Sequence, residues 1–340
     1  MLLNIWVTRD CNFRCKYCYV PSYETSMNNT CLEQLFVFLD ELYEQKYFTD
    51  NLVINFHGGE PLLNIEIIFK IINFTKDRYK KLLKNLNYGM TTNGYLLTKE
   101  ISDYISENFK YNLSVSIDGG RETFDLLRKT TYGNSGFDKV IDNVTYLLSK
   151  NDEVRARMTY TSKTVNKIFE NINYVSSLGF KNIVLAPNLF DDSWEDEHLS
   201  IFNTQIDKVY QKYAGDNAVS INLIEDRLNR TKGMCTGGHT SLNIDYNGQI
   251  YPCTMAVGTE MFNIGNIFEG IDLLKLNNIM QYRYINNSEC DNCDIMNCCN
   301  GKRCFIINKL ISDNYNSPSP WMCGQNNIIY NKQIEYNLIK

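Results

Sequence analysis

The sequence predicts an α/β fold in which a partial (β/α)6 TIM-like barrel precedes a cysteine-rich C-terminal domain. Strand-like and helix-like segments alternate six times over about 210 residues, which is the pattern of parallel strands joined by right-handed crossovers. A complete eightfold barrel needs about 250 residues, so six units predict an open barrel. The twelve cysteines, apart from Cys31, fall into two groups near the two ends of the chain.

The elements follow from composition and periodicity. The predicted strands are short apolar or β-branched runs, at residues 2–7, 51–56, 86–92, 111–118, 154–161 and 182–187. The predicted helices have apolar residues at spacings of three and four, at residues 30–45, 65–79, 98–108, 136–150, 165–179 and after about Trp194. We expect Thr30 to cap the first helix. Functional groups of such folds lie on the loops after the strands.

Composition excludes several classes of function. The net charge is −5 and no run of Lys or Arg occurs, which argues against a nucleic-acid partner. The apolar start "MLLNIWV" is interrupted by Arg9 and Asp10, so neither a signal peptide nor a membrane span is predicted. We therefore expect a cytoplasmic protein without a membrane partner, whose cysteines bind metal or act in catalysis rather than form disulfides. Cys31 is expected to be a small core residue.

The segment "CNFRCKYC", residues 11–18, follows the first predicted strand. Three thiolates can bind three irons of a [4Fe–4S] cluster and leave the fourth iron open to an external ligand. The alternative is zinc, but zinc usually takes four ligands in paired C-x2-C spacing. The next three strands are followed by "HGGEP", "TTNG" and "SIDGG", so four unusual loops share one rim of the predicted barrel.

These segments resemble the radical S-adenosylmethionine (radical SAM) enzymes. The resemblance rests on "CNFRCKYC", with Tyr17 before its third cysteine, and on "GGEP", "TTNG" and "SID" in the family's order, and it covers residues 1 to about 205. It implies that Cys11, Cys15 and Cys18 are the catalytic cluster ligands. It also implies that the open iron binds the amino and carboxylate groups of S-adenosylmethionine, whose cleavage releases a 5′-deoxyadenosyl radical that abstracts hydrogen from a substrate.

The resemblance also implies a set of cofactor-binding residues, namely Gly58, Gly59, Glu60, Asn93, Ser116, Asp118 and Arg128. The Gly-Gly-Glu loop would meet the methionine amino group, because glycines let a backbone approach a ligand closely and a carboxylate suits an ammonium group. Ser116 and Asp118 would lie near the ribose and the methionyl carboxylate, with Asn93 close by. Arg128 would either pair with that carboxylate or be a solvated arginine at a helix end.

The C-terminal cysteines resemble the SPASM extension, a module with two auxiliary [4Fe–4S] clusters found in radical SAM enzymes that act on peptides and proteins. Their pattern is C-x12-G-x4-C, then C-x2-C-x5-C-x4-C, then x18-C. The resemblance assigns Cys290, Cys293, Cys299 and Cys323 to the far cluster, and Cys235, Cys253 and Cys304 to the near one. Residues 243–252 are predicted to form a hairpin with Asn247 and Gly248 at its turn.

Two ligand assignments stay open. The last gap is x4 where the family commonly has x3, and Cys298 adjoins Cys299, so either could be the ligand. The near cluster has three protein ligands, because Ser241 stands where some relatives have another cysteine. Its fourth iron is either open or bound by His239, Cys298 or a substrate atom. Zinc binding is the alternative for this region.

The predicted domains are a radical SAM partial barrel at 1–215, a bridging segment at 216–232, a SPASM domain at 233–326 and a tail at 327–340. The chain begins directly at the first strand, so we expect leader recognition to need a separate leader-binding protein or another surface. The other expected partners are a ribosomally made precursor peptide and an electron donor of the flavodoxin or ferredoxin type.

Two enzymatic functions compete. The first is a maturase that crosslinks a ribosomally made peptide through a thioether or carbon–carbon bond. The second is an anaerobic sulfatase maturase, but that subfamily typically has Asp where Thr254 stands and Gln where His57 stands. A non-catalytic iron–sulfur or zinc scaffold is a third possibility, which the intact "GGEP" and "SID" loops disfavour.

The remaining histidine-containing segments carry two predictions. His57 is either a site residue or a hydrogen-bonded structural histidine. The segment "DDSWEDEH", with Trp194 and His198, is predicted to be a solvated loop and helix start.

Overall fold

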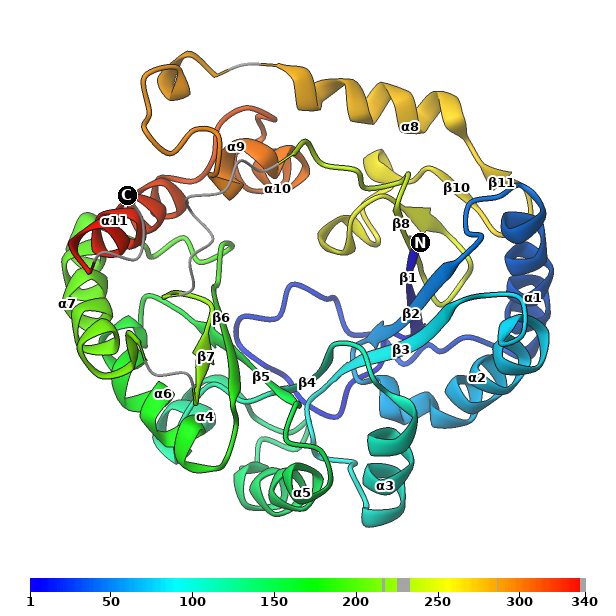
Figure 1. Cartoon of the computed structure of the whole chain (residues 1–340), viewed down its shortest axis with the longest axis horizontal. Helices are drawn as coiled ribbons and strands as arrows, with labels where there is room; N and C mark the ends of the chain where they lie inside the picture. Colours follow the sequence, from blue (N-terminus) through cyan, green and yellow to red (C-terminus); the bar gives the residue numbers. More distant parts are fainter. Residues whose placement is uncertain (216–217, 225–232, 286, 337–340) are drawn as a thin grey trace.

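A computed structural model describes residues 1–215, 218–224, 233–285 and 287–336. Much of the predicted bridging segment (216–217 and 225–232) and the last four residues of the predicted tail lie outside the described residues. The described chain contains a nine-stranded sheet in the order β7-β6-β5-β4-β3-β2-β1-β8-β9 (Figure 1). Strands β1 to β6 are parallel and follow the sequence order, which confirms the predicted partial barrel.

The elements have the following bounds. The strands are β1 Leu2–Thr8, β2 Asn51–Gly58, β3 Asn85–Thr92, β4 Leu113–Ser116, β5 Arg155–Tyr160, β6 Asn182–Pro187, β7 Ser220–Ile221, β8 Ser241–Ile244, β9 Ile250–Tyr251, β10 Gly265–Asn266 and β11 Gly270–Ile271. The α-helices are α1 Asn29–Glu44, α2 Ile65–Tyr79, α3 Lys99–Asn108, α4 Arg121–Leu127, α5 Phe137–Lys150, α6 Ile168–Ser177, α7 Asp196–Tyr213, α8 Leu273–Met280, α9 Asn300–Arg303, α10 Phe305–Ser312 and α11 Pro320–Glu335.

The structure differs from the predicted elements at α1, at α4 and around Trp194. Helix α1 begins one residue before Thr30, because the side chain of Asn28 accepts the Cys31 N–H (2.9 Å) and caps the helix instead. The short helix α4 was not predicted. The prediction of a solvated loop is wrong for Trp194, whose ring stacks on Trp321 of α11 at 3.7 Å. His198 caps α7, where its Nδ1 accepts the N–H of Glu195.

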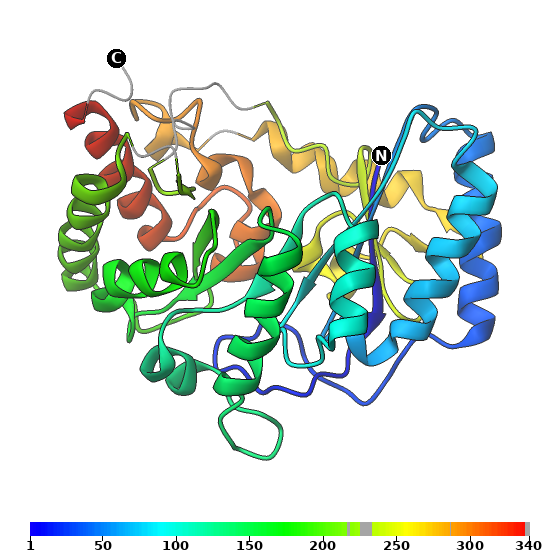
Figure 2. The same ribbon diagram turned by 60° about the horizontal axis from the view of Figure 1, so that its bottom comes forward.

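The two faces of the sheet differ in polarity. Alternate residues such as Leu3, Ile5 and Val7 are fully buried on the outer face, which α1 to α3 and α5 to α7 cover (Figure 2). The residues between them, Asn4 and Trp6, point to the concave face, which carries polar side chains beside this tryptophan. Asn4 of β1 pairs in register with Asn55 of β2 and, on its other side, with Asn243 of β8, so an asparagine row crosses three strands. The interior of the barrel is therefore suited to a polar ligand.

The C-terminal region closes the open side of the barrel (Figure 1). Strand β8 extends the sheet beside β1, and β8 and β9 form the predicted hairpin, with Gly248 at φ +84° in its turn. A buried ion pair of Arg9 and Asp245 (2.6 Å) joins this hairpin to the barrel. At the other end α11 packs on α7, where Lys332 pairs with Asp207 (2.6 Å). Among the described residues, no helix has the length and apolar composition that crossing a bilayer requires.

Candidate functional site

The three-cysteine loop follows β1 and is held by main-chain hydrogen bonds. The N–H of Arg14 donates to the carbonyl of Lys129 (2.7 Å), and the N–H of Lys16 donates to Leu127 (2.9 Å). From the other side, the N–H of Thr131 donates to the carbonyl of Asn12 (3.0 Å). The loop therefore runs beside the segment 127–131 in a defined conformation. This pairing brings Arg128, in that segment, close to the cysteines.

Two thiols of this loop, those of Cys11 and Cys15, lie among N–H donors, whereas the exposed Cys18 thiol donates to the Val20 carbonyl (3.6 Å). The sulfur of Cys11 accepts from the Phe13 N–H (3.4 Å) and from Asn93 Nδ2 (3.8 Å), and the sulfur of Cys15 accepts from the Arg128 guanidinium (3.8 Å). Burial raises the pKa of Cys11 to about 12 and that of Cys15 to about 11, so both are protonated until a metal replaces the proton. Donors aimed at sulfur stabilise metal-bound thiolates. This donor set fits an iron–sulfur cluster.

Glu60 is fully buried and orients Asn93. Its carboxylate accepts hydrogen bonds from the Leu62 N–H (3.1 Å), the Thr92 hydroxyl (2.7 Å) and the Asn93 N–H (2.6 Å). Burial raises the pKa of Glu60 to about 7 against the opposing effect of these hydrogen bonds. The side chain of Asn93 in turn donates to Asn12 Oδ1 (2.8 Å) and faces the Cys11 sulfur. Glu60 thus supports the three-cysteine loop through Asn93.

The two glycines before Glu60 make room for the protein's own backbone. A Cβ on Gly58 would lie 2.2 Å from the Thr8 carbonyl oxygen, and one on Gly59 would lie 2.3 Å from that of Asp10. Gly58 also has φ +146°, which disfavours other residues. The sequence suggested that the glycines let the backbone approach a ligand. In the structure they let β2 approach the residues that lead into the three-cysteine loop.

Asp118 and Arg128 form a buried pair. Arg128 Nε donates to Asp118 Oδ2 (2.6 Å), and the other groups that donate to Asp118 are the Tyr17 hydroxyl (2.7 Å) and the Thr159 N–H (2.7 Å). Arg128 is only 5% exposed, so the alternative of a solvated helix-end arginine is wrong. Ser116, the last residue of β4, is half-buried on the concave face. The loops that follow β1 and β4 are thereby held to each other and to strand β5 around one carboxylate.

Cys253 lies within the electrostatic influence of Cys304 and Cys235. Among the residues that the structure describes, no three or more His, Cys, Asp and Glu side chains are arranged so that they could hold a metal ion. Burial raises the pKa of Cys253 to about 11, and the charges of Cys304 and Cys235 add to this shift. Cys253 follows the β8–β9 hairpin, whereas Cys304 lies between α9 and α10. His239 is exposed on the turn that its N–H closes with the Thr236 carbonyl (3.0 Å). The assignment of Cys235, Cys253 and Cys304 to the near cluster therefore stays a prediction.

The adjacent cysteines 298 and 299 point in different directions. Cys298 is 7% exposed within the hydrophobic core, and its thiol donates to the Ile295 carbonyl (3.3 Å). The sulfur of Cys299 instead accepts from the Gly301 N–H (3.2 Å) and from Asn326 Nδ2 (3.3 Å). Asn326 lies one turn after Cys323 on α11. The environment of a metal-binding thiolate is therefore found at Cys299.

A row of hydrogen bonds, buried at its centre and part-buried at its ends, connects His57 with Thr254. Asn55 Nδ2 contacts His57 Nε2 (2.6 Å) and donates to Asn4 Oδ1 (3.1 Å), and Asn4 Nδ2 donates to Asn243 Oδ1 (2.9 Å). The Thr254 hydroxyl donates to the same Asn243 oxygen (2.6 Å). Sequence analysis missed this row. The available signal was a single asparagine at the centre of each of two apolar strands.

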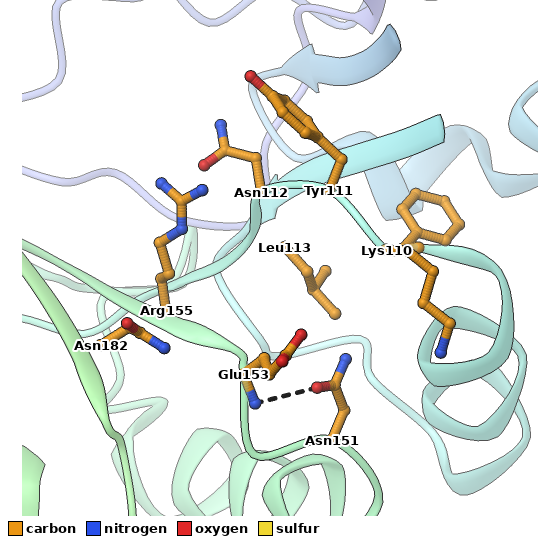
Figure 3. A pocket seen from close by; sticks show the side chains of 9 residues that line it. Lys110, Tyr111, Asn112, Leu113, Asn151, Glu153, Arg155 and Asn182 are labelled. Atoms are coloured by element: carbon orange, nitrogen blue, oxygen red, sulfur yellow. Dashed lines mark hydrogen bonds between the residues drawn. The ribbon is translucent and has the colours of Figure 1, made fainter. Parts of the chain in front are cut away.

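A pocket of about 300 Å³ lies at the opposite end of the barrel, at the amino ends of β4 to β6 (Figure 3). It is lined by Asn112, Glu153, Arg155 and Asn182, among other residues. Because the cysteine loop follows the carboxyl end of β1, this pocket is not part of the site described above.

A partial barrel with a three-cysteine loop and a C-terminal module of clustered cysteines defines a class, the radical SAM enzymes with an added iron–sulfur module. The sequence profile of the Radical SAM superfamily matches residues 5–151, and that of SPASM, an iron–sulfur cluster-binding domain, matches residues 235–303. The chain belongs to the radical SAM enzymes that carry a SPASM domain. Membership implies [4Fe–4S] clusters and S-adenosylmethionine as cofactors.

Relatives of known activity differ among themselves. The chain is 26% identical over 332 residues to the radical SAM cyclopropyl synthase TigE of Paramaledivibacter caminithermalis, covering 88% of this chain and 66% of TigE. It is 26% identical over 314 residues to a cysteine-type anaerobic sulfatase-maturating enzyme of Clostridium novyi, covering 84% and 82%.

Solved structures share the fold. That of anSMEcpe with bound AdoMet and Cp18Cys peptide has a TM-score of 0.83 at 22% identity and covers 100% of both chains. That of Streptococcus suis SuiB bound to the precursor peptide SuiA has a TM-score of 0.65 at 17% identity and covers 95% of this chain and 75% of SuiB.

Proposed function

We propose that this enzyme matures a ribosomally made peptide by forming a thioether or carbon–carbon crosslink. In this proposal Cys11, Cys15 and Cys18 hold the cluster that binds S-adenosylmethionine. The residues proposed to surround S-adenosylmethionine are Gly58, Gly59, Glu60, Asn93, Ser116, Asp118 and Arg128. When bound, the reduced cluster and S-adenosylmethionine supply a 5′-deoxyadenosyl radical that removes a hydrogen atom from a substrate carbon.

The buried groups of this rim would position the cofactor. Because Glu60 and Asp118 are held by three or more donors each, their carboxylates cannot easily reorient. They fix Asn93 and Arg128, which face the sulfurs of Cys11 and Cys15. A rigid rim of this kind supports oriented hydrogen abstraction, because a well-aligned intramolecular geometry lowers the barrier.

The C-terminal module is proposed to hold the auxiliary clusters. The far cluster would be bound by Cys290, Cys293, Cys299 and Cys323, and the near one by Cys235, Cys253 and Cys304. The burial of Cys298 supports Cys299 as the ligand. The domain limits proposed from the sequence, 1–215 for the barrel and 233–326 for the SPASM domain, place the boundary before β8, although β8 pairs with β1 in one sheet.

The observation that carries the crosslinking proposal is the environment of Thr254. Its hydroxyl proton is committed to Asn243, so this position provides a neutral hydrogen-bonded group where sulfatase maturases typically have a carboxylate. His57 does not replace that base, because burial, and secondarily the charge of Arg157, lowers its pKa to about 4. Formylglycine formation would need another proton acceptor.

Sulfatase maturation is the second candidate, favoured by the similarity to the Clostridium novyi enzyme over 84% of this chain. Mass spectrometry after reaction separates the two functions when the candidate sulfatase peptide carries cysteine at the modified position, because serine would lose two hydrogens in either case. A crosslink removes two hydrogens and retains all sulfur, whereas conversion of cysteine to formylglycine loses the cysteine sulfur. Loss of sulfur from a sulfatase-derived peptide would contradict the crosslinking proposal.

The proposed partners are a precursor peptide, a flavodoxin- or ferredoxin-type electron donor and a separate leader-binding protein. Copurification with the products of neighbouring genes tests the last of these, and reduction by purified flavodoxin tests the second.

A further inference from the structure

Two ion pairs of the described residues join the C-terminal module to the barrel, and they differ in burial. The side chains of Arg9 and Asp245 are 7% and 3% exposed, whereas Asp207, the partner of Lys332, is 34% exposed. Arg9 Nε donates to both carboxylate oxygens of Asp245 (3.2 and 3.1 Å), and its Nη2 donates to Oδ2 (2.6 Å). A buried ion pair costs desolvation free energy and is weak evidence for stability, so this directional geometry points to another role.

The guanidinium of Arg9 is enclosed by parts of the module that precede and follow Cys253 in the chain. Asp245 precedes this cysteine, and the neighbouring Tyr246 ring lies 6.0 Å from Arg9 Cζ. Gly258 follows it at φ +88°, and a Cβ on Gly258 would lie 2.4 Å from Arg9 Nη2. The side chain of Arg9 therefore fills a closely bounded space between the barrel rim and the module.

The main chain around Arg9 is fixed to the rim of the barrel. The N–H of Arg9 donates to the carbonyl of Thr25 (2.9 Å), and the N–H of Glu60 donates to the carbonyl of Asp10 (2.8 Å). Asp10 Oδ1 in turn accepts the N–H of Cys11 (2.7 Å). Because only Asp10 separates Arg9 from Cys11, a displacement of Arg9 would move both the three-cysteine loop and the loop of Glu60.

We propose that Arg9 is a positioning residue, which fixes the three-cysteine loop relative to the C-terminal module through its fork on Asp245. Arginine suits this role because its planar guanidinium binds both oxygens of a carboxylate in one orientation. The loops of Cys11 and Glu60 both meet the chain beside Arg9, so the affinity for S-adenosylmethionine should depend on the pair. This last step rests on the proposed function, in which both loops bind S-adenosylmethionine, whereas the fixing of the loop does not.

The test replaces the pair by apolar residues, as Arg9→Met together with Asp245→Leu, because apolar groups that replace a buried ion pair often preserve stability. The matched control is Lys332→Met together with Asp207→Leu, at the other ion pair between the module and the barrel. Amide hydrogen exchange in the cluster-free proteins, read by peptide mass spectrometry, reports the order of the loop, and thermal denaturation reports global stability. Equilibrium dialysis of the anaerobically reconstituted enzymes measures the affinity for S-adenosylmethionine.

We expect the Arg9→Met, Asp245→Leu protein to keep a melting temperature close to that of the wild type. Peptides covering residues 8–18 should nevertheless exchange about tenfold faster, because an apolar contact does not fix the orientation of the loop. S-adenosylmethionine should bind about tenfold more weakly, which corresponds to about 1.4 kcal/mol. The control protein should match the wild type in exchange and in affinity.

Arg9→Lys separates charge from geometry, because lysine keeps the charge without the fork, and it should also speed exchange in residues 8–18. Unchanged exchange in this segment, an equal increase in the control protein, or wild-type affinity for S-adenosylmethionine in the Arg9→Met, Asp245→Leu protein would overturn the proposal. If the wild-type enzyme itself failed to bind S-adenosylmethionine, that result would contradict the proposed function, and the exchange comparison would still decide whether Arg9 fixes the loop.

Discussion

The two cysteine regions of this chain are assembled in different ways. Cys11, Cys15 and Cys18 lie on one loop, and the segment 127–131 holds that loop through main-chain hydrogen bonds. The C-terminal group is collected from a hairpin, two short helices and the first turn of α11. A local loop keeps its ligands adjacent by chain connectivity alone. A dispersed group depends on the packing of the whole module. A neighbouring cysteine can therefore replace one of its members as a ligand only if the packing changes.

The largest effect on activity is expected when the three-cysteine loop loses its thiols. Replacing Cys11, Cys15 and Cys18 with Ala should abolish formation of 5′-deoxyadenosine, because the cluster that activates S-adenosylmethionine is lost. The C-terminal clusters should remain, so iron should fall from about 12 to about 8 per chain, since each cluster has four irons. Cys31→Ala, in the buried core of the barrel, is the control and should keep all the iron. Appreciable S-adenosylmethionine cleavage by the triple variant would place the chemistry elsewhere.

The dispersed group should show opposite effects at adjacent residues. Cys299→Ala should lose the far cluster, about four irons, because its sulfur faces the donors Gly301 and Asn326. Cys298→Ala should keep the iron and lower the free energy of unfolding by about 1 kcal/mol, since a buried sulfur is removed. Iron analysis and thermal denaturation measure both. Iron loss at Cys298 instead of Cys299 would show that α9 packs differently.

The near group should respond to a substrate thiol. The three thiolates proposed for it would leave one iron without a protein thiolate, because Cys298 is turned into the core. A Cys-containing peptide should therefore alter the electron paramagnetic resonance signal of the auxiliary clusters, whereas the Ser-substituted peptide should not. The competing assignment predicts no response to either peptide and a changed signal in His239→Ala.

The smallest effect is expected when a single hydrogen-bond donor to a cluster ligand is removed. Asn326→Ala should make the reduction potential of the far cluster more negative, because an N–H donor to a ligand sulfur stabilises the reduced state. Asn327→Ala is the matched control, because that side chain is one residue further along α11 and donates to the Cys323 carbonyl. Protein-film voltammetry measures the shift. Equal potentials in the two variants would show that Asn326 does not influence the cluster.

Local sequence determined the six βα units, the three-cysteine loop and the β8–β9 hairpin. Helix α2 has the predicted bounds of 65–79, since its apolar spacing and its burial coincide. The cap of α1 was predicted wrongly, because Asn28 and Thr30 are both good capping residues and only the backbone geometry selects one.

Tertiary structure decided how the polar groups are paired. The three donors to Asp118 come from separate parts of the chain, since Tyr17 and Arg128 lie on different loops and Thr159 lies in β5. No local sequence pattern therefore reveals that the carboxylate of Asp118 is already occupied. The same holds for the row of Asn4, Asn55 and Asn243, which strand register brings together over long sequence separations. Burial makes an unpaired polar group costly, so the fold settles which donors and acceptors are satisfied.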